Sequence, residues 1–121
     1  YKAIEQKNYT SFLDKDARLP MMYIDDAINA TVSIMEADAR QIKIRSSYNL
    51  AAMSFSPGEI AAEIKKHIPE FEIRYEPDFR QEIAQSWPES IDDSDAREDW
   101  GWEHRYELEE LTRTMLEHLQ Q

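Results

Sequence analysis

Short β-forming runs alternate with amphipathic helical runs along the whole chain, an order that is typical of the α/β class. Residues rich in β-formers occur at 9–13, 19–23, 42–50 and 71–75. Apolar residues recur at helical spacing in the segments that begin near residues 24, 56 and 108. We therefore predict a single α/β domain over residues 1–121, with a small mixed sheet and about three main helices.

Local signals predict where several helices begin and end. Ser56 and Glu59 have the spacing of a capping box. Asp25 and Asp26 stand where the start of a helix favours carboxylates, as a cap and as a countercharge to the helix dipole. Gly101 is expected to end a short helix that starts near residue 92. A further short helix is predicted over residues 79–86.

Glycine is scarce, which argues against a nucleotide-binding loop within this chain. Only Gly58 and Gly101 occur, and both stand at predicted helix ends. A dinucleotide site needs a glycine-rich turn so that the backbone can approach the pyrophosphate at the start of a helix. We therefore expect no cofactor-binding residues among residues 1–121.

The charge balance excludes some classes of partner. The chain has 25 acidic and 14 basic residues, for a formal net charge of -11. Such a surface repels phosphate backbones and anionic lipids, so we expect neither nucleic-acid nor membrane binding. No apolar run approaches the roughly 20 residues that span a bilayer. Cysteine is absent, which is compatible with a reducing compartment, and we expect a cytoplasmic location.

No motif for metal binding or catalysis is present. The three histidines, His67, His104 and His118, lack the spacing of a zinc site, and we expect all three at the surface. A calcium loop counted from Asp93 fails, because Glu98 stands where the loop needs glycine. There is also no G-x-S-x-G elbow. We therefore predict no metal ligands and no catalytic residues in this chain.

Several segments resemble one family, the extended short-chain dehydrogenases. They are Arg18–Ile28, Tyr48–Leu50, Phe55–Ile60 and the run from Asp92 to Trp102. Three further segments resemble the short-chain type of L-threonine 3-dehydrogenase, namely Leu50–Phe55, Ser86–Pro88 and Asp99–Trp102. Sugar-nucleotide epimerases and dehydratases share the general pattern but usually not these three segments. The resemblance covers nearly all 121 residues.

The resemblance implies a C-terminal, substrate-side part of an NAD-dependent enzyme with a Rossmann-type fold. The family's glycine-rich loop and its catalytic Tyr-x-x-x-Lys would then lie upstream of Tyr1, and NAD would be bound mainly there. The implied reaction is oxidation of L-threonine to 2-amino-3-ketobutyrate, by a full-length protein that forms a homodimer. The chain alone would be inactive, and it would expose an apolar patch where the two parts meet.

Three residues are candidates for contact with the substrate L-threonine, each with a structural alternative. Trp87 could wall the pocket, with Pro88 fixing its loop, or could be a core or inter-domain side chain. Arg80 resembles an arginine that related sugar-nucleotide enzymes use to hold phosphate, or it is a surface residue. Met21 could face the substrate, or belong to the core.

Two other functions stay open from the sequence. The chain could belong to a nucleotide-sugar epimerase or dehydratase, because the general pattern is shared. It could instead be a stand-alone acidic interaction module that has inherited this shape. The residues upstream of Tyr1 would separate these alternatives.

Overall fold

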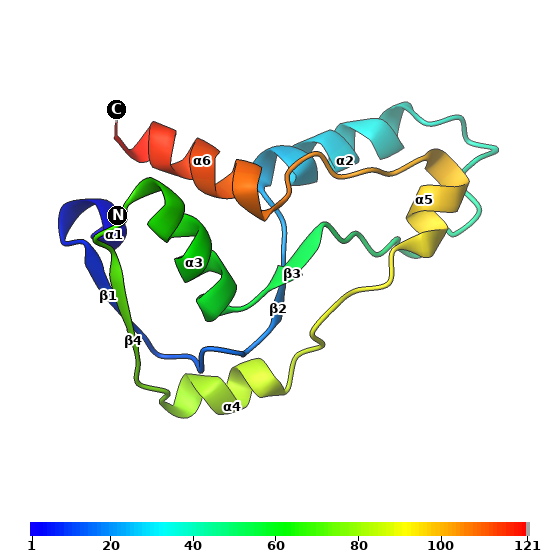
Figure 1. Ribbon diagram of the computed structural model, residues 1–121. Helices are drawn as coiled ribbons and strands as arrows, with labels where there is room; N and C mark the ends of the chain where they lie inside the picture. The colour runs from blue at the N-terminus through cyan, green and yellow to red at the C-terminus, as the bar shows by residue number, and fades with distance from the viewer. Residues whose placement is uncertain (121) are drawn as a thin grey trace.

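The computed structural model describes residues 1–120, which form six helices and four short strands (Figure 1). In chain order they are α1 (Lys2–Glu5), β1 (Asn8–Ser11), β2 (Leu19–Met21), α2 (Ile24–Glu36), β3 (Met53–Phe55), α3 (Pro57–His67), β4 (Glu72–Tyr75), α4 (Phe79–Gln85), α5 (Ser94–Trp100) and α6 (Leu108–Leu119). The predicted α/β class is confirmed. The three long helices α2, α3 and α6 match the number of main helices predicted.

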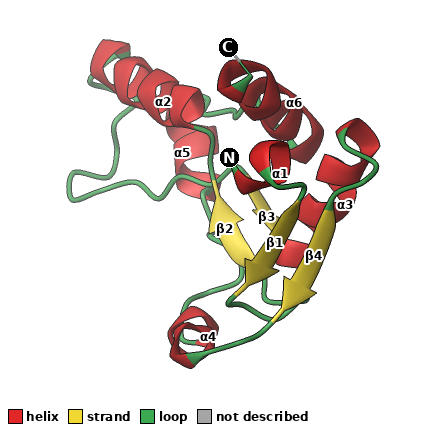
Figure 2. Cartoon of the chain, turned by 90° about the vertical axis from the view of Figure 1, so that its left-hand side faces the viewer, coloured by secondary structure: helices red, strands yellow, loops and turns green. Residues whose placement is uncertain are grey.

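The strands pair in two ways, so that both parallel and antiparallel ladders occur. β1 pairs with β4 in parallel, from Asn8 opposite Glu72 to Ser11 opposite Tyr75. β2 pairs with β3 antiparallel, and Leu19 lies opposite Phe55. These are two separate two-stranded sheets rather than one continuous sheet (Figure 2).

Two of the predicted helix ends are confirmed. The hydroxyl of Ser56 accepts a hydrogen bond from the amide of Glu59, whose carboxylate accepts one from the amide of Ser56. This reciprocal pair is the capping box that opens α3. Gly101 ends α5 with a φ of 74°, a left-handed conformation that glycine adopts without steric cost.

The prediction that Asp25 and Asp26 cap α2 is wrong. The cap residue is Tyr23, and no side chain caps the helix there. Both aspartates lie inside the first turn, where they still oppose the helix dipole. The side chain of Asp26 is fully buried and binds the loop before α6 instead.

The prediction of a strand over residues 42–50 is also wrong. This segment forms a loop, in which the hydroxyl of Tyr48 accepts hydrogen bonds from the amides of Lys43 (3.0 Å) and Ile44 (3.1 Å). The nearby strand is β3, which sequence reasoning did not identify.

The main core lies between α2, α5 and the loop before α6. Its buried members are Ala30, Ala96, Trp100 and Trp102. Trp102 is also fixed by a hydrogen bond of 3.0 Å from its indole nitrogen to the carbonyl of Ala51. Within residues 1–120, no helix is both long and apolar enough to cross a membrane.

Candidate functional site

Trp87 lines a cleft of about 370 Å³ between α4 and the loop that precedes β2. The side chain follows the end of α4 and is 60% exposed. Other polar side chains of the cleft come from the loop, from α4 and from the segment after Trp87: Asp14, Asp16, Arg18, Gln81 and Glu89. The cleft is thus concave and has one aromatic side chain among mainly polar lining residues, which makes it more polar than a typical small-molecule site.

The walls of the cleft are held by hydrogen bonds across the fold. The amide of Asp14 donates to the side-chain carbonyl of Gln81 at 2.8 Å, which fixes the loop to α4. The guanidinium of Arg18 donates to both carboxylate oxygens of Glu59 at 2.9 Å and also to the carbonyl of Ser54. The hydrogen bond from Arg18 holds the pKa of Glu59 below its usual value.

The resulting charge of the cleft is negative. Asp14, Asp16 and Glu89 contribute carboxylates, whereas Arg18, the one cation among the lining residues in the described range 1–120, is paired with Glu59. A bound cationic group would therefore be favoured there, and a phosphate would be repelled.

Arg80, the second predicted substrate residue, is held outside the lining of this cleft. Its guanidinium pairs with Asp78, which also caps α4, at 2.6 Å. It also stacks on Phe12, 3.5 Å from the ring centroid. The ion pair raises the pKa of Arg80 and lowers the pKa of Asp78. In both cases the side-chain hydrogen bond between the two residues is the largest cause. These contacts already engage the guanidinium, and the role of Arg80 in binding stays a prediction.

Met21, the third candidate, lies at the end of β2 and is 40% exposed. It lines an apolar cavity of about 260 Å³ between the strands and α3, together with Leu19 and Phe55. It also borders a smaller hollow beside Leu50 and Ile91. The structure does not bring Met21 into the cleft of Trp87.

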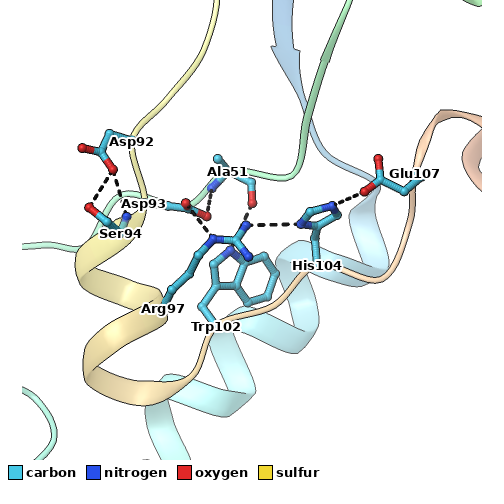
Figure 3. A network of polar contacts seen from close by, with 8 residues as sticks. All are labelled: Ala51, Asp92, Asp93, Ser94, Arg97, Trp102, His104 and Glu107. Carbon is cyan, nitrogen blue, oxygen red and sulfur yellow. Dashed lines mark hydrogen bonds and ion pairs between the residues drawn. The ribbon is translucent and has the colours of Figure 1, made fainter.

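A chain of polar contacts anchors the segment that follows Trp87 (Figure 3). The carboxylate of Asp93 accepts hydrogen bonds from Arg97 (2.8 Å) and from the amide of Ala51 (3.2 Å). Burial raises the pKa of Asp93, but these hydrogen bonds outweigh it and hold that pKa below its usual value. Arg97 and Glu107 contact opposite nitrogens of the His104 ring, at 3.3 Å and 2.7 Å.

His104 corrects the expectation of three surface histidines. His67 and His118 are exposed, but the side chain of His104 is only 18% exposed. Because Arg97 can only donate, Nδ1 of His104 accepts, and Nε2 carries the proton that is donated to Glu107. In residues 1–120, no three His, Cys, Asp or Glu side chains are grouped so that they could hold a metal ion.

Sequence reasoning singled out Trp87 as a candidate, which stays a prediction, but it did not identify the residues that line the cleft with it. The spacing of Asp93 and Arg97, four residues apart on a helix, could have indicated their ion pair. Nothing in the sequence indicated that Arg18 and Gln81 would line the same cleft, since 63 residues separate them.

Comparisons with known proteins relate almost the entire chain to longer proteins. It is 50% identical over 117 residues to the mitochondrial L-threonine 3-dehydrogenase of Bos taurus, covering 96% of the chain and 31% of that protein. It is 45% identical over 122 residues to an uncharacterized epimerase/dehydratase of Staphylococcus aureus (strain MRSA252), covering 100% and 38%. The chain thus spans about a third of the length of these curated relatives. No family model matches.

Solved structures agree with the sequence comparison. The GalE-like L-threonine dehydrogenase from Cupriavidus necator in its apo form is 55% identical with a TM-score of 0.93, covering 98% of this chain and 42% of that one. A monomeric L-threonine 3-dehydrogenase from a metagenome is 45% identical with a TM-score of 0.91, covering 98% and 38%. Nearly the whole chain thus matches, at 45% to 55% identity, one part of longer proteins that are named L-threonine 3-dehydrogenase or epimerase/dehydratase.

Proposed function

We propose that this chain is the substrate-side part of an NAD-dependent dehydrogenase that oxidises L-threonine at its β-hydroxyl carbon, giving 2-amino-3-ketobutyrate. One observation carries the proposal: the chain matches proteins named L-threonine dehydrogenase at 50% to 55% identity over nearly its full length. Because the chain spans about a third of the curated relatives, the activity belongs to a longer parent protein.

The charge of the cleft beside Trp87 supports an amino-acid substrate. The ammonium group of L-threonine would be attracted by Asp14, Asp16 and Glu89, provided that its carboxylate faces away from them, and an indole such as that of Trp87 can contact a cation or a methyl group. A nucleotide sugar carries a diphosphate, which the same three carboxylates would repel. We infer that Trp87 forms one wall of the L-threonine pocket in the parent protein.

The residues of this chain do not fit the NAD cofactor. Gly58 opens α3, where its amide donates to the carbonyl of Lys15, and Gly101 ends α5. Neither stands in a glycine-rich loop, and no tyrosine is followed four residues later by lysine. We infer that the rest of the parent holds NAD and the catalytic groups, and that the isolated chain is inactive.

The decisive experiment incubates the full-length parent with NAD and L-threonine and follows NADH formation. We expect the full-length parent to produce NADH with L-threonine. We expect the isolated 121-residue chain to produce none under the same conditions. Turnover of L-threonine by the isolated chain would contradict the assignment of the chemistry to the rest of the parent.

A nucleotide-sugar epimerase or dehydratase is the second candidate, because a staphylococcal relative named as an uncharacterized epimerase/dehydratase matches the whole chain at 45% identity. The same assay separates the two candidates. Conversion of a nucleotide sugar without NADH formation from L-threonine would favour the second.

The pocket role of Trp87 is tested in the full-length parent with Trp87→Ala and with Trp87→Phe. If the ring walls the pocket, Trp87→Ala raises KM for L-threonine more than KM for NAD, and Trp87→Phe restores part of the loss. Equal effects on both KM values would show that Trp87 has a general structural role. A homodimeric parent and a cytoplasmic location stay predictions.

A further inference from the structure

The segment that follows α4 carries Trp87 and Glu89, two residues that line the cleft. Every residue from 85 to 92 is exposed, so packing does little to hold this segment in place. Its two ends are fixed, because α4 ends just before Trp87 and the carboxylate of Asp93 binds the amide of Ala51. The contact that holds the middle of the segment therefore decides where its side chains stand in the cleft.

Ser54 of β3 supplies that contact. Its hydroxyl donates a hydrogen bond to the backbone carbonyl of Glu89. Across the described residues 1–120, this is the only hydrogen bond made by residues 88–91. Side chains alternate along a strand, and Phe55 lines the apolar cavity beside α3, so the side chain of Ser54 points to the opposite side of β3.

The backbone of the same serine holds the facing wall of the cleft. The carbonyl of Ser54 accepts a hydrogen bond from the guanidinium of Arg18, which belongs to the loop before β2 and lines the cleft. In the pairing of β2 with β3, Ser54 lies opposite Pro20. Because proline has no amide hydrogen, Pro20 cannot pair with that carbonyl, which is left for the side chain of Arg18. Both carboxylate oxygens of Glu59 hold the same guanidinium at 2.9 Å.

Ser54 thus joins two walls that are far apart in sequence. Arg18 lies 36 positions before it, and Glu89 lies 35 positions after it. The wall formed by the loop carries the carboxylate of Asp16, and the other wall carries the indole of Trp87. The spacing between these two groups therefore depends on the contacts that Ser54 makes in both directions.

We propose that Ser54 is a positioning residue of the cleft, which sets the distance between its two walls and thereby how well the cleft binds an amino-acid substrate. Ser54 is not among the residues that line the cleft, so it acts through Arg18 and Glu89 rather than by touching the substrate. Small displacements are sufficient, because the groups that recognise a ligand must be held within about 0.5 Å of the productive geometry. The identity of the substrate rests on the proposed function, whereas the link between the walls does not.

The first test compares two substitutions of Ser54 in the full-length parent. Ser54→Ala removes the hydroxyl, and Ser54→Thr keeps it. We expect Ser54→Ala to raise KM for L-threonine about fivefold, the effect of one lost hydrogen bond, and to leave KM for NAD nearly unchanged. Ser54→Thr should restore the KM of the wild type for L-threonine.

Ser90→Ala is the matched control, because it removes an exposed hydroxyl from the same segment without touching the contacts of Ser54. It should change neither KM value. An unchanged KM for L-threonine in the Ser54→Ala variant would overturn the proposal. Equal increases in the Ser54→Ala and Ser54→Thr variants would also overturn it, and so would a parallel rise of both KM values, which a general loss of stability produces.

A second measurement is independent of the substrate. Spin labels on Asp16→Cys and Ser90→Cys, in a parent without other cysteines, report the distance between the two walls by pulsed electron paramagnetic resonance. Adding Ser54→Ala should shift or broaden the distance distribution, and adding Ser54→Thr should not. An unchanged distribution with Ser54→Ala would overturn the positioning role even if the parent oxidises L-threonine. A changed distribution in a parent that does not oxidise L-threonine would support the positioning role and contradict only the proposed function.

Discussion

At the scale of single residues, Asp26 connects parts of the chain that are far apart in sequence. Its fully buried carboxylate accepts hydrogen bonds from the amides of Arg105 (2.9 Å) and Tyr106 (3.1 Å). We expect Asp26→Ala to lower the free energy of unfolding by about 3 kcal/mol, because two amides lose a charged acceptor. Asp26→Asn should cost less, since one acceptor oxygen remains. Urea unfolding of the chain measures both.

The control for this prediction is Asp25→Asn, at an exposed neighbour that contributes equally to the charge of the first turn. It should leave the free energy of unfolding nearly unchanged. If Asp26→Ala were as stable as the wild type, the buried carboxylate would have no structural role.

Residue roles could be read from the sequence only where the partner is close along the chain. Ser56 and Glu59 are three residues apart, and their capping box was predicted correctly. Asp26 contacts the backbone 79 residues away, so its sequence position near a helix start suggested a local cap instead. His104 was wrongly assigned to the surface although its partners, Arg97 and Glu107, are only seven and three residues away, because the burial of its side chain depends on tertiary packing.

At the scale of elements, Asp99 of α5 fixes the loop over residues 43–48. Its carboxylate is only 7% exposed and accepts hydrogen bonds from Lys43 and Tyr48. These hydrogen bonds lower the pKa of Asp99 below its usual value of 3.8, and the one from Lys43 is the largest cause. The carboxylate of Asp99 therefore takes up a proton less readily in the folded state than in the unfolded state. The stabilisation is complete above about pH 5 and is lost as the pH falls through the lowered pKa.

We expect Asp99→Asn to remove this part of the acid sensitivity. Between about pH 5 and pH 2, the variant should lose less unfolding free energy than the wild type, although it is less stable at neutral pH. Glu98→Gln, at an exposed neighbour on the same helix, is the control and should keep the wild-type pH dependence. Chemical unfolding at a series of pH values measures the effect. Parallel curves for Asp99→Asn and the wild type would contradict it.

Elements were predictable where local chemistry decides them. The helices with periodic apolar residues were all found, and the strand predicted at 71–75 became β4. The segment 42–50 has the composition of a strand, but a strand also needs a neighbour for its backbone, and none lies beside it in residues 1–120. β3 was missed because it has only three residues and depends on its pairing with β2.

At the scale of the whole molecule, the candidate cleft depends on a relation that the sequence does not display. Trp87 could be singled out because Ser86–Pro88 resembles a segment of the substrate-side part of the family. The carboxylates of Asp14 and Asp16 reach it only because β1 and β4 run parallel, which brings the segments after both strands to the same end of the sheet. That parallel pairing, between segments far apart along the chain, was not predicted.

The net charge of -11 predicts how salt affects the isolated chain. Excess carboxylates repel one another in the folded state, and raising salt from about 0.01 M to about 0.1 M shortens the screening length from about 30 Å to about 10 Å. The thermal midpoint, followed by circular dichroism, should therefore rise by a few degrees. Near the isoelectric point of about 4.6 the net charge is close to zero, and the same addition of salt should have little effect. A fall of the midpoint at neutral pH would mean that screened ion pairs, such as Arg18 with Glu59, outweigh the repulsion.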